Sequence, residues 1–236
     1  MRKKKDVKVL YVDQDIIVCE KPQGMPTVSD KTGDLDVVSC LKNYLCFQQG
    51  AESLEVFVVH RLDRPVGGVM VFARTKEAAG NLSEQIRNHQ FDKCYQAVLT
   101  GWLPEEDGTF TDYLLKDSKS NTTKVVSKDT KDAREAVLDY EVLDMVELDK
   151  GKYTYCLIDL KTGRHHQIRV QFAKRGCGIW GDTKYNPKFQ KTKKIYKEIG
   201  LYATKIEFLH PRTKELIRYK VEAVGEAFDM ILSAEE

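Results

Sequence analysis

A carboxylate flanked by two arginines marks the most unusual segment of this chain. The sequence FVVHRLDRPVGGVMVFART places Asp63 between Arg61 and Arg64, in a short polar bridge between two strongly apolar stretches. Strand ends and the loops beyond them often carry catalytic groups, because a rigid scaffold holds them there. A guanidinium nearby would keep Asp63 ionised, which suits a nucleophile or a base. The alternative is a structural Arg–Asp pair that ties down a turn.

A second segment, LKTGRHHQIRVQFAKRG, gathers basic side chains. Gly163 ends an expected strand, and Arg164 opens an expected helix that contains Arg169. An arginine there could clamp a carboxylate through two hydrogen bonds or hold a phosphate. His165 and His166 would suit a metal, but adjacent helical residues point in different directions. Because no carboxylate follows at ligand spacing, we expect no metal site.

A tyrosine near a lysine forms the third group, in the segment FDKCYQAVLTG. Tyr95 lies on an expected strand, two residues after Lys93. Its flat ring can stack on a nucleic-acid base, and its hydroxyl can handle protons. The alternative is a tyrosine packed in the core with a satisfied hydroxyl group.

The scaffold that must hold these groups is rich in β-structure. Apolar and β-branched stretches predict strands at 7–12, 16–19, 56–59, 69–72, 93–100, 136–143, 153–160, 201–208 and 216–221. Helical spacing of apolar residues predicts helices at 36–47, 76–89, 165–175 and 226–233. Short connections favour a mixed, largely antiparallel sheet with a few flanking helices, an α+β fold. Polar composition predicts an exposed hairpin or insertion at 116–134 and a mobile loop at 184–200.

The composition is that of a soluble globular protein. The 236 residues are 42% hydrophobic and 31% charged, and no apolar run approaches the roughly 20 residues that span a bilayer. No apolar segment follows the basic N-terminus, which excludes a secretory signal and predicts a cytoplasmic protein. The six cysteines are widely spaced and form no Cys-x-x-Cys pair, so we expect free thiols.

The distribution of charge is more informative than its sum. The net charge is only +2, which does not by itself indicate a nucleic-acid-binding protein. Residues 184–197, however, contain six lysines, two tyrosines and no acid, whereas acids gather at 105–107 and 141–149. Such a chain can present one basic face to phosphates, although lysine runs are also common as solvated surface.

Together the motifs resemble those of the RluA family of pseudouridine synthases. The family pattern H-R-L-D-R is followed by small residues and an apolar strand, and residues 60–75 match it. Further family motifs match at 93–101, 162–170, 176–185 and 201–211, in order, so the resemblance runs from about residue 9 to 220. The chain departs from the family at Val66-Gly67, His165, Gly178 and Tyr202, which we interpret as subfamily variation.

The resemblance implies roles for individual residues. Asp63 matches the catalytic aspartate, Tyr95 the active-site tyrosine, and Arg169 the arginine that pairs with the catalytic carboxylate. Ile168 lies where an aliphatic residue lines the base pocket, and Arg61 matches the arginine that helps to displace the uridine from its stack. We expect the substrate-binding residues to be Arg61, Arg64, Ile168, Arg164 and His60.

The implied activity is isomerisation of a uridine in structured RNA, either rRNA or tRNA. The target nucleotide must be flipped into a pocket, and Asp63 could then attack C1′, attack C6 or deprotonate the sugar. The resemblance implies no cofactor, a single catalytic domain over 1–236 without a separate N-terminal RNA-binding domain, and a monomer that contacts RNA but no membrane. One alternative is an RNA-binding or RNA-folding factor without turnover, which the intact Asp63, Tyr95 and Arg169 disfavour. The other is a small-molecule isomerase or hydrolase, which leaves the basic segments unexplained.

Overall fold

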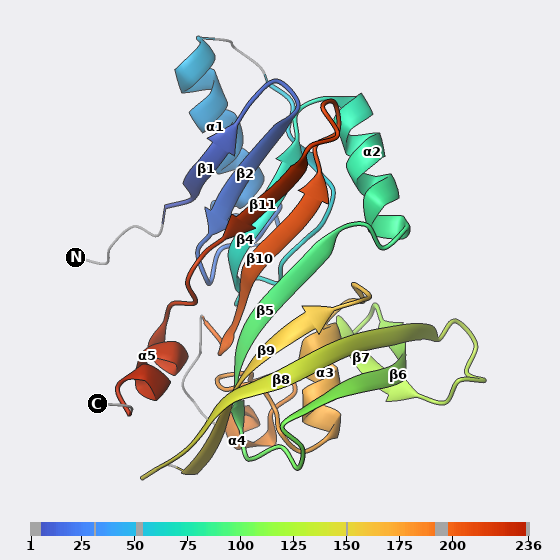
Figure 1. Ribbon diagram of the computed structural model, residues 1–236, viewed down its shortest axis with the longest axis vertical. Coiled ribbons are helices and arrows are strands. Elements are labelled where there is room, and N and C mark those ends of the chain that lie inside the picture. Colours follow the sequence, from blue (N-terminus) through green and yellow to red (C-terminus); the bar gives the residue numbers. More distant parts are fainter. Residues whose placement is uncertain (1–5, 31, 51–53, 150, 192–197, 235–236) are drawn as a thin grey trace. The chain divides into compact units, whose positions relative to one another are not determined.

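The chain forms largely antiparallel β-structure with a few helices, the expected α+β fold (Figure 1). The computed structural model describes residues 6–30, 32–50, 54–149, 151–191 and 198–234. It contains two compact units, one formed by residues 1–92 and 203–222, the other by residues 93–202 and 223–236.

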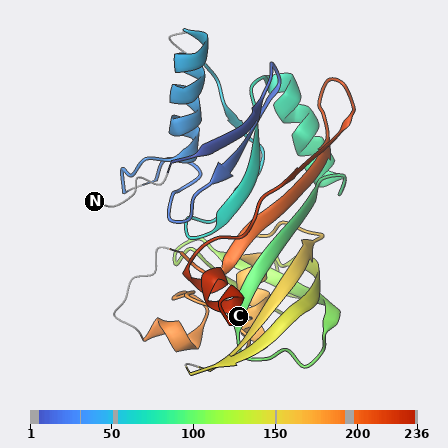
Figure 2. The same cartoon turned by 60° about the vertical axis from the view of Figure 1, so that its left-hand side comes forward.

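The first unit is a β-sheet with two long helices. The strands lie in the order β1 (Lys8–Val12), β2 (Ile16–Lys21), β4 (Gly67–Ala73) and β10 (Leu201–Leu209), with β3 (Phe57–Val58) paired to β4 and β11 (Leu216–Lys220) to β10. The pairs of β2 with β1 and β4, and of β11 with β10, are antiparallel. The helices are α1 (Val37–Gln49) and α2 (Lys76–Arg87), and Figure 2 shows them on either side of the strands.

Burial of both faces explains the continuous apolar sequence of β2. Successive side chains of a strand point to opposite faces. Ile16 and Val18 belong to the core cluster that contains Leu82 of α2, while Ile17 and Cys19 point the other way and are equally buried. This burial raises the pKa of the Cys19 thiol above its ordinary value. The strand therefore forms the centre of the first unit.

A glycine allows two backbones to meet directly after the H-R-L-D-R loop. Gly68 has a φ of +125°, and a Cβ atom built on it would lie 2.2 Å from the backbone oxygen of Ala203. No residue with a side chain fits such a gap. At Gly68 the group that approaches closely is therefore the backbone of β10.

Helix α2 offers a clear test of glycine energetics. Its N-cap Thr75 accepts a hydrogen bond from Ala78 N, but Gly80 in its interior meets no described atom within 4 Å of an added Cβ. We expect Gly80→Ala to raise the free energy of unfolding by about 1 kcal/mol, because alanine loses less backbone entropy in a helix. The control is Gly50→Ala at the α1 C-cap, where φ is +64°. There the same change should destabilise by about 1 kcal/mol. Urea denaturation measures both, and equal signs would contradict the prediction.

The second unit is an antiparallel sheet that carries three shorter helices. Its strands lie in the order β5 (Asp92–Thr100), β9 (Gly151–Leu160), β8 (Arg134–Leu148), β6 (Asp107–Asp117) and β7 (Thr122–Val126). The helices are α3 (Gln167–Lys174), α4 (Pro187–Gln190) and α5 (Glu226–Leu232). Phe172 holds α3 on the sheet through edge contacts with Phe110 and Tyr140, and Phe228 of α5 packs on Tyr155.

The structure confirms the predicted helices and strands, with shifted ends. In the part of the chain that it describes, it also contains two strands and one short helix that were not predicted. Strand β6 was not predicted, and the polar segment 116–134 contains the turn of the β6–β7 hairpin and strand β7. The helix predicted at 165–175 begins only at Gln167, because His166 has a left-handed φ of +54°. Helix α4 lies within the loop expected at 184–200. Residues 192–197 of that loop and of the lysine-rich stretch lie outside the described residues.

Candidate active site

Asp63 is half-buried in the loop between β3 and β4. Val66 N donates to the Asp63 carbonyl oxygen at 3.0 Å, which closes a turn after the carboxylate. On the other side, Thr27 Oγ1 donates to the carbonyl oxygen of buried Leu62 at 2.9 Å. The backbone on both sides of Asp63 is therefore fixed by hydrogen bonds, which is how a loop holds a catalytic side chain in place.

A fully buried lysine anchors the same loop. Lys21 Nζ donates to the carbonyl oxygens of Met25 at 2.6 Å, Pro22 at 3.1 Å and Arg64 at 3.2 Å. Gly24 N also donates to the Arg64 carbonyl oxygen, at 2.8 Å. A buried ammonium group needs such acceptors for its N–H groups. Lys21 thus links the K-P-Q-G turn to the residue after Asp63. The sequence did not indicate this contact.

The side chain of Arg64 turns towards an acidic loop of the first unit. Its guanidinium pairs with Asp34 and, at 3.3 Å, with Asp30, and it donates to Thr32 Oγ1 at 3.0 Å. The hydrogen bond from Arg64 and that from Thr32 lower the pKa of Asp34. The structure therefore shows an anchor for the loop around Asp63, while the predicted RNA contact of Arg64 stays a prediction.

His60 and Arg61 differ in their surroundings. His60 Nε2 accepts a hydrogen bond from Val71 N at 3.1 Å, and its ring lies against Phe91 at a centroid distance of 5.4 Å. Arg61, the next residue, is exposed. The environment of His60 is that of a residue that fixes the loop to β4. The RNA contacts of His60 and Arg61 stay predictions.

Tyr95 and Lys93 lie on one face of strand β5 in the second unit. Tyr95 is paired in register with Ile158 of β9 and is 7% exposed. A Cβ atom added to Gly163 would lie 3.3 Å from Lys93 Nζ, so the K-x-Y and T-G-R motifs meet in this unit. Burial lowers the pKa of the Lys93 ammonium group.

The start of α3 is held by the side chain of Gln167. Its Oε1 accepts from Thr162 Oγ1 at 2.8 Å and from Arg164 N at 3.0 Å, and its Nε2 donates to the Val137 carbonyl oxygen at 3.1 Å. These bonds tie the segment before α3 to strand β8. They hold the first turn of α3, which contains Ile168 and Arg169, against the sheet.

The two adjacent histidines are bonded to hydroxyl groups. His165 Nδ1 and Thr123 Oγ1 are 2.9 Å apart, and His166 Nδ1 lies 2.6 Å from the hydroxyl of Tyr185. The imidazole rings stack on each other at a centroid distance of 3.7 Å. The pair thus joins β7 to the segment after α3 by hydrogen bonds.

Arg169 forms a buried two-pronged ion pair with Asp182. Arg169 Nε donates to Asp182 Oδ2 at 2.7 Å and Nη2 donates to Oδ1 at 2.8 Å, and the residues are 5% and 0% exposed. Asp182 Oδ1 also accepts from the backbone N–H groups of Lys184 and Tyr185. The sequence analysis missed this pair, although Asp182 lies in the matched G-D-x-x-Y motif. A guanidinium has five N–H donors, so the fork does not exhaust it, and the pairing of Arg169 with Asp63 stays a prediction.

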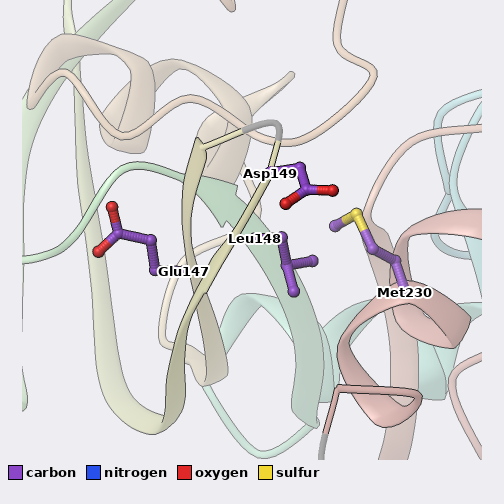
Figure 3. A pocket seen from close by; sticks show the side chains of 4 residues that line it. All are labelled: Glu147, Leu148, Asp149 and Met230. Carbon is purple, nitrogen blue, oxygen red and sulfur yellow. The ribbon is translucent and has the colours of Figure 1, made fainter.

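One hollow of the second unit does not suit RNA. A cavity of about 570 Å³ is lined by Glu147, Leu148, Asp149 and Met230 (Figure 3). Two of these four side chains are carboxylates, which repel phosphate groups. RNA phosphates are therefore not expected to bind in this hollow.

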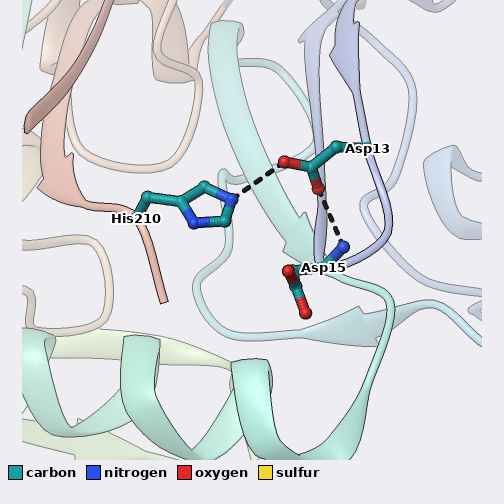
Figure 4. Close-up of side chains that lie close together, drawn as sticks. All are labelled: Asp13, Asp15 and His210. Atoms are coloured by element: carbon teal, nitrogen blue, oxygen red, sulfur yellow. Dashed lines mark hydrogen bonds and ion pairs between the residues drawn. The ribbon is translucent and has the colours of Figure 1, made fainter. Parts of the chain in front are cut away.

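In the first unit, Asp13, Asp15 and His210 could each offer a ligand atom within 4.8 Å of the others (Figure 4). Their atoms are already engaged, however. The Asp13 carboxylate accepts from Asp15 N, Ile16 N and His210 Nε2, each at 2.8 Å, and Asp15 pairs with Arg212 at 2.7 Å. The group is a hydrogen-bonded clasp between the β1–β2 turn and the end of β10.

This clasp predicts a pH dependence of stability. Burial alone would raise the pKa of Asp13, but hydrogen bonds from the N–H groups of Ile16 and Asp15, then Tyr11 and His210, lower it overall. A lowered folded-state pKa stabilises the protein above the unfolded pKa of about 4, and this contribution is lost as pH falls through the folded pKa. We expect Asp13→Asn to have a lower Tm than the wild type at pH 6. Near pH 2–3 the two Tm values should become similar. Calorimetry across this range measures it.

The control for this experiment is Asp129→Asn, which alters an exposed carboxylate in the turn before β8. Its Tm should follow the wild type at every pH. A constant difference between Asp13→Asn and the wild type at all pH values would show that the charge of Asp13 is not responsible.

The sequence profile of the RNA pseudouridylate synthase family matches residues 15–174. The tRNA pseudouridine synthase C of Vibrio cholerae is 31% identical over 225 residues, covering 89% of this chain and 88% of the relative. The enzyme of the same name from Haemophilus ducreyi is 34% identical, covering 90% and 89%. Among solved structures, human RNA pseudouridylate synthase domain containing 4 matches with a TM-score of 0.74 at 21% identity, covering 92% of this chain and 88% of that one. It shows the same fold.

The profile match takes in the H-R-L-D-R loop, the K-x-Y strand and the start of α3. It covers well over half of the chain, and the relatives extend the similarity to about nine tenths of it. The chain therefore belongs to the RNA pseudouridylate synthase family, in its RluA type, and is an enzyme that isomerises uridine to pseudouridine in RNA.

Proposed function

We propose that this enzyme modifies tRNA, with Asp63 as its catalytic carboxylate. The sequence left rRNA and tRNA open. The observation that favours tRNA is the similarity, at 31–34% identity, to several enzymes named tRNA pseudouridine synthase C. Because the match covers nearly nine tenths of both partners, it extends beyond the catalytic motifs to most of the surface that could meet an RNA.

The isomerisation breaks the N1–C1′ bond of uridine and forms a C5–C1′ bond, while C5 loses a proton and N1 gains one. In our proposal the uridine is flipped into a pocket bordered by Tyr95 and Ile168, because its reacting atoms are inaccessible in a stacked helix. Asp63 then starts the reaction as a nucleophile at C1′ or C6, or as a base towards the sugar. Arg169 keeps the carboxylate charged and oriented.

The same proposal includes a monomeric, cytoplasmic enzyme made of one catalytic domain. All six cysteines remain thiols, and thiols persist in a reducing compartment. No helix among the described residues is long and apolar enough to cross a membrane.

Site mapping tests this proposal. RNA from cells that lack the protein is treated with a pseudouridine-specific carbodiimide and read by primer extension, before and after incubation with the wild type or Asp63→Asn. We expect a new stop in a tRNA with the wild type alone. A stop that is confined to rRNA would refute the substrate, and a stop restored by Asp63→Asn would refute the catalytic residue.

A further inference from the structure

A hollow beside the β6–β7 hairpin carries an excess of positive charge. It has a volume of about 400 Å³ and lies within the second unit. Its lining comprises Leu114, Leu115, Lys116, Thr123, Asp132, Arg134, Gly163, Arg164 and His165. Three of these residues are permanent cations and one is an acid. The hollow is therefore suited to an anion.

The register of the hairpin determines which of its lysines face this hollow. Lys116 of β6 is paired with Thr123 of β7, and residues directly opposite each other share a face of the sheet. Leu114, two positions before Lys116, packs with Val170 of α3, so this face is the one that α3 covers. Lys124 follows Thr123 and points to the opposite face. Lys116 therefore lines the hollow, and Lys124 lies on the other face of the hairpin.

The cations of the hollow form no ion pair with a carboxylate among the described residues, in contrast to five other arginines. Carboxylates elsewhere pair with Arg64, Arg169, Arg175, Arg212 and Arg218. Within the described part of the chain, no ion pair joins Lys116, Arg134 or Arg164 to an acid. Arg164 is instead steadied by the bond from its Nε to the Glu135 carbonyl oxygen, at 2.8 Å. Charges that the protein leaves unneutralised around a hollow favour binding of an anionic ligand.

We propose that this hollow, formed around Lys116, Arg134 and Arg164, binds a phosphodiester group of the RNA strand next to the target uridine. The proposal rests on the proposed function. Arg164 lies three residues before the start of α3, the helix that carries Ile168 and Arg169, so an RNA strand with its uridine beside α3 would pass close to the hollow. An arginine at such a place can take two phosphate oxygens at once. The bound phosphate sets the position of the strand and is independent of base sequence.

The test compares Lys116→Ala/Arg134→Ala with Lys124→Ala. Filter binding to bulk tRNA and, separately, to bulk rRNA is measured over a range of salt concentrations. At about 0.15 M salt we expect the double variant to bind about tenfold more weakly. Its slope of log K against log salt should be shallower by about 0.7–0.9 for each lost phosphate contact. Lys124→Ala should match the wild type in both quantities.

Charge-conserving substitutions and turnover separate this role from a structural one. Lys116→Arg/Arg134→Lys should restore the wild-type salt slope. In turnover of the RNA found by site mapping, Lys116→Ala/Arg134→Ala should raise KM and leave kcat within about twofold, because saturating RNA compensates for lost uniform binding. If the double alanine variant binds and turns over RNA as Lys124→Ala does, the phosphate site is refuted.

Phosphate ethylation locates the contact on the RNA. In the wild type, ethylation of a phosphate close to the target uridine should block binding, and this interference should vanish in Lys116→Ala/Arg134→Ala. An unchanged interference pattern would also refute the site. Since binding is measured on both classes of RNA, modification of rRNA instead of tRNA would refute the substrate while the result for the hollow still stands.

Discussion

Asp63→Asn is expected to reduce the rate of uridine conversion by at least about 10³-fold, as is typical when a catalytic nucleophile or base is removed. The affinity for RNA should change by no more than about twofold to threefold, because one half-buried side chain contributes little to a large RNA interface. Asparagine has the size of aspartate and leaves the backbone bonds at Val66 and Leu62 in place. It lacks the ionised oxygen that every version of the mechanism requires.

Single-turnover kinetics on RNA tritiated at C5 of uridine measures this effect, since the isomerisation releases the C5 hydrogen. Asp6→Asn provides a control with the same chemical change, at an exposed position before β1. It should release tritium at the wild-type rate. Release by Asp63→Asn within about tenfold of the wild type would exclude Asp63 as nucleophile or base.

The sequence predicted well those elements whose side chains follow one simple pattern. Residues 16–19 are continuously apolar because both faces of β2 are buried. The helical spacing of Ala79, Leu82 and Ile86 indicated α2. Leu82 lies in the core of the first unit, and Ala79 and Ile86 pack against that core. Where burial alone determines the choice of residue, the sequence is sufficient.

The sequence pattern did not predict strand β6, because a polar side chain lies on the inward face of this strand. Phe110 and Leu114 are buried, but Asp112 between them interrupts the apolar alternation. The Asp112 carboxylate accepts hydrogen bonds from Gln171 and Arg175 of the α3 segment, each at 2.8 Å. A polar inward residue of this kind is recognisable only when its tertiary partner is known.

The residues of the site were recognisable, but their supports were not. Asp63, Tyr95 and Arg169 lie in motifs that a sequence displays directly. The anchoring of the Asp63 loop by Lys21 and the clamping of Arg169 by Asp182 are contacts between separate segments. Neither spacing nor composition encodes such contacts. The structure therefore adds mainly the residues that hold the proposed catalytic residues in place.

Asp182→Ala is expected to lower the free energy of unfolding by about 3–5 kcal/mol, the usual effect of removing one partner of a buried ion pair. Arg169 would lose both prongs of the fork, and the N–H groups of Lys184 and Tyr185 would lose their acceptor. Urea denaturation measures the change. Asp112→Ala is the matched control, because its pair with Arg175 is partly exposed. It should have the smaller effect, and equal effects would contradict the importance of burial.

A double variant then separates the structural role of Arg169 from its proposed catalytic role. Replacing both partners of a buried pair by apolar residues is often close to neutral for stability. We expect Arg169→Met/Asp182→Leu to recover part of the stability lost in Asp182→Ala, although the N–H groups of Lys184 and Tyr185 still lack an acceptor. Tritium release should remain at least about 10²-fold below the wild type, because no guanidinium then orients Asp63. If activity returned together with stability, Arg169 would serve the fold alone, and another group would have to keep the carboxylate ionised.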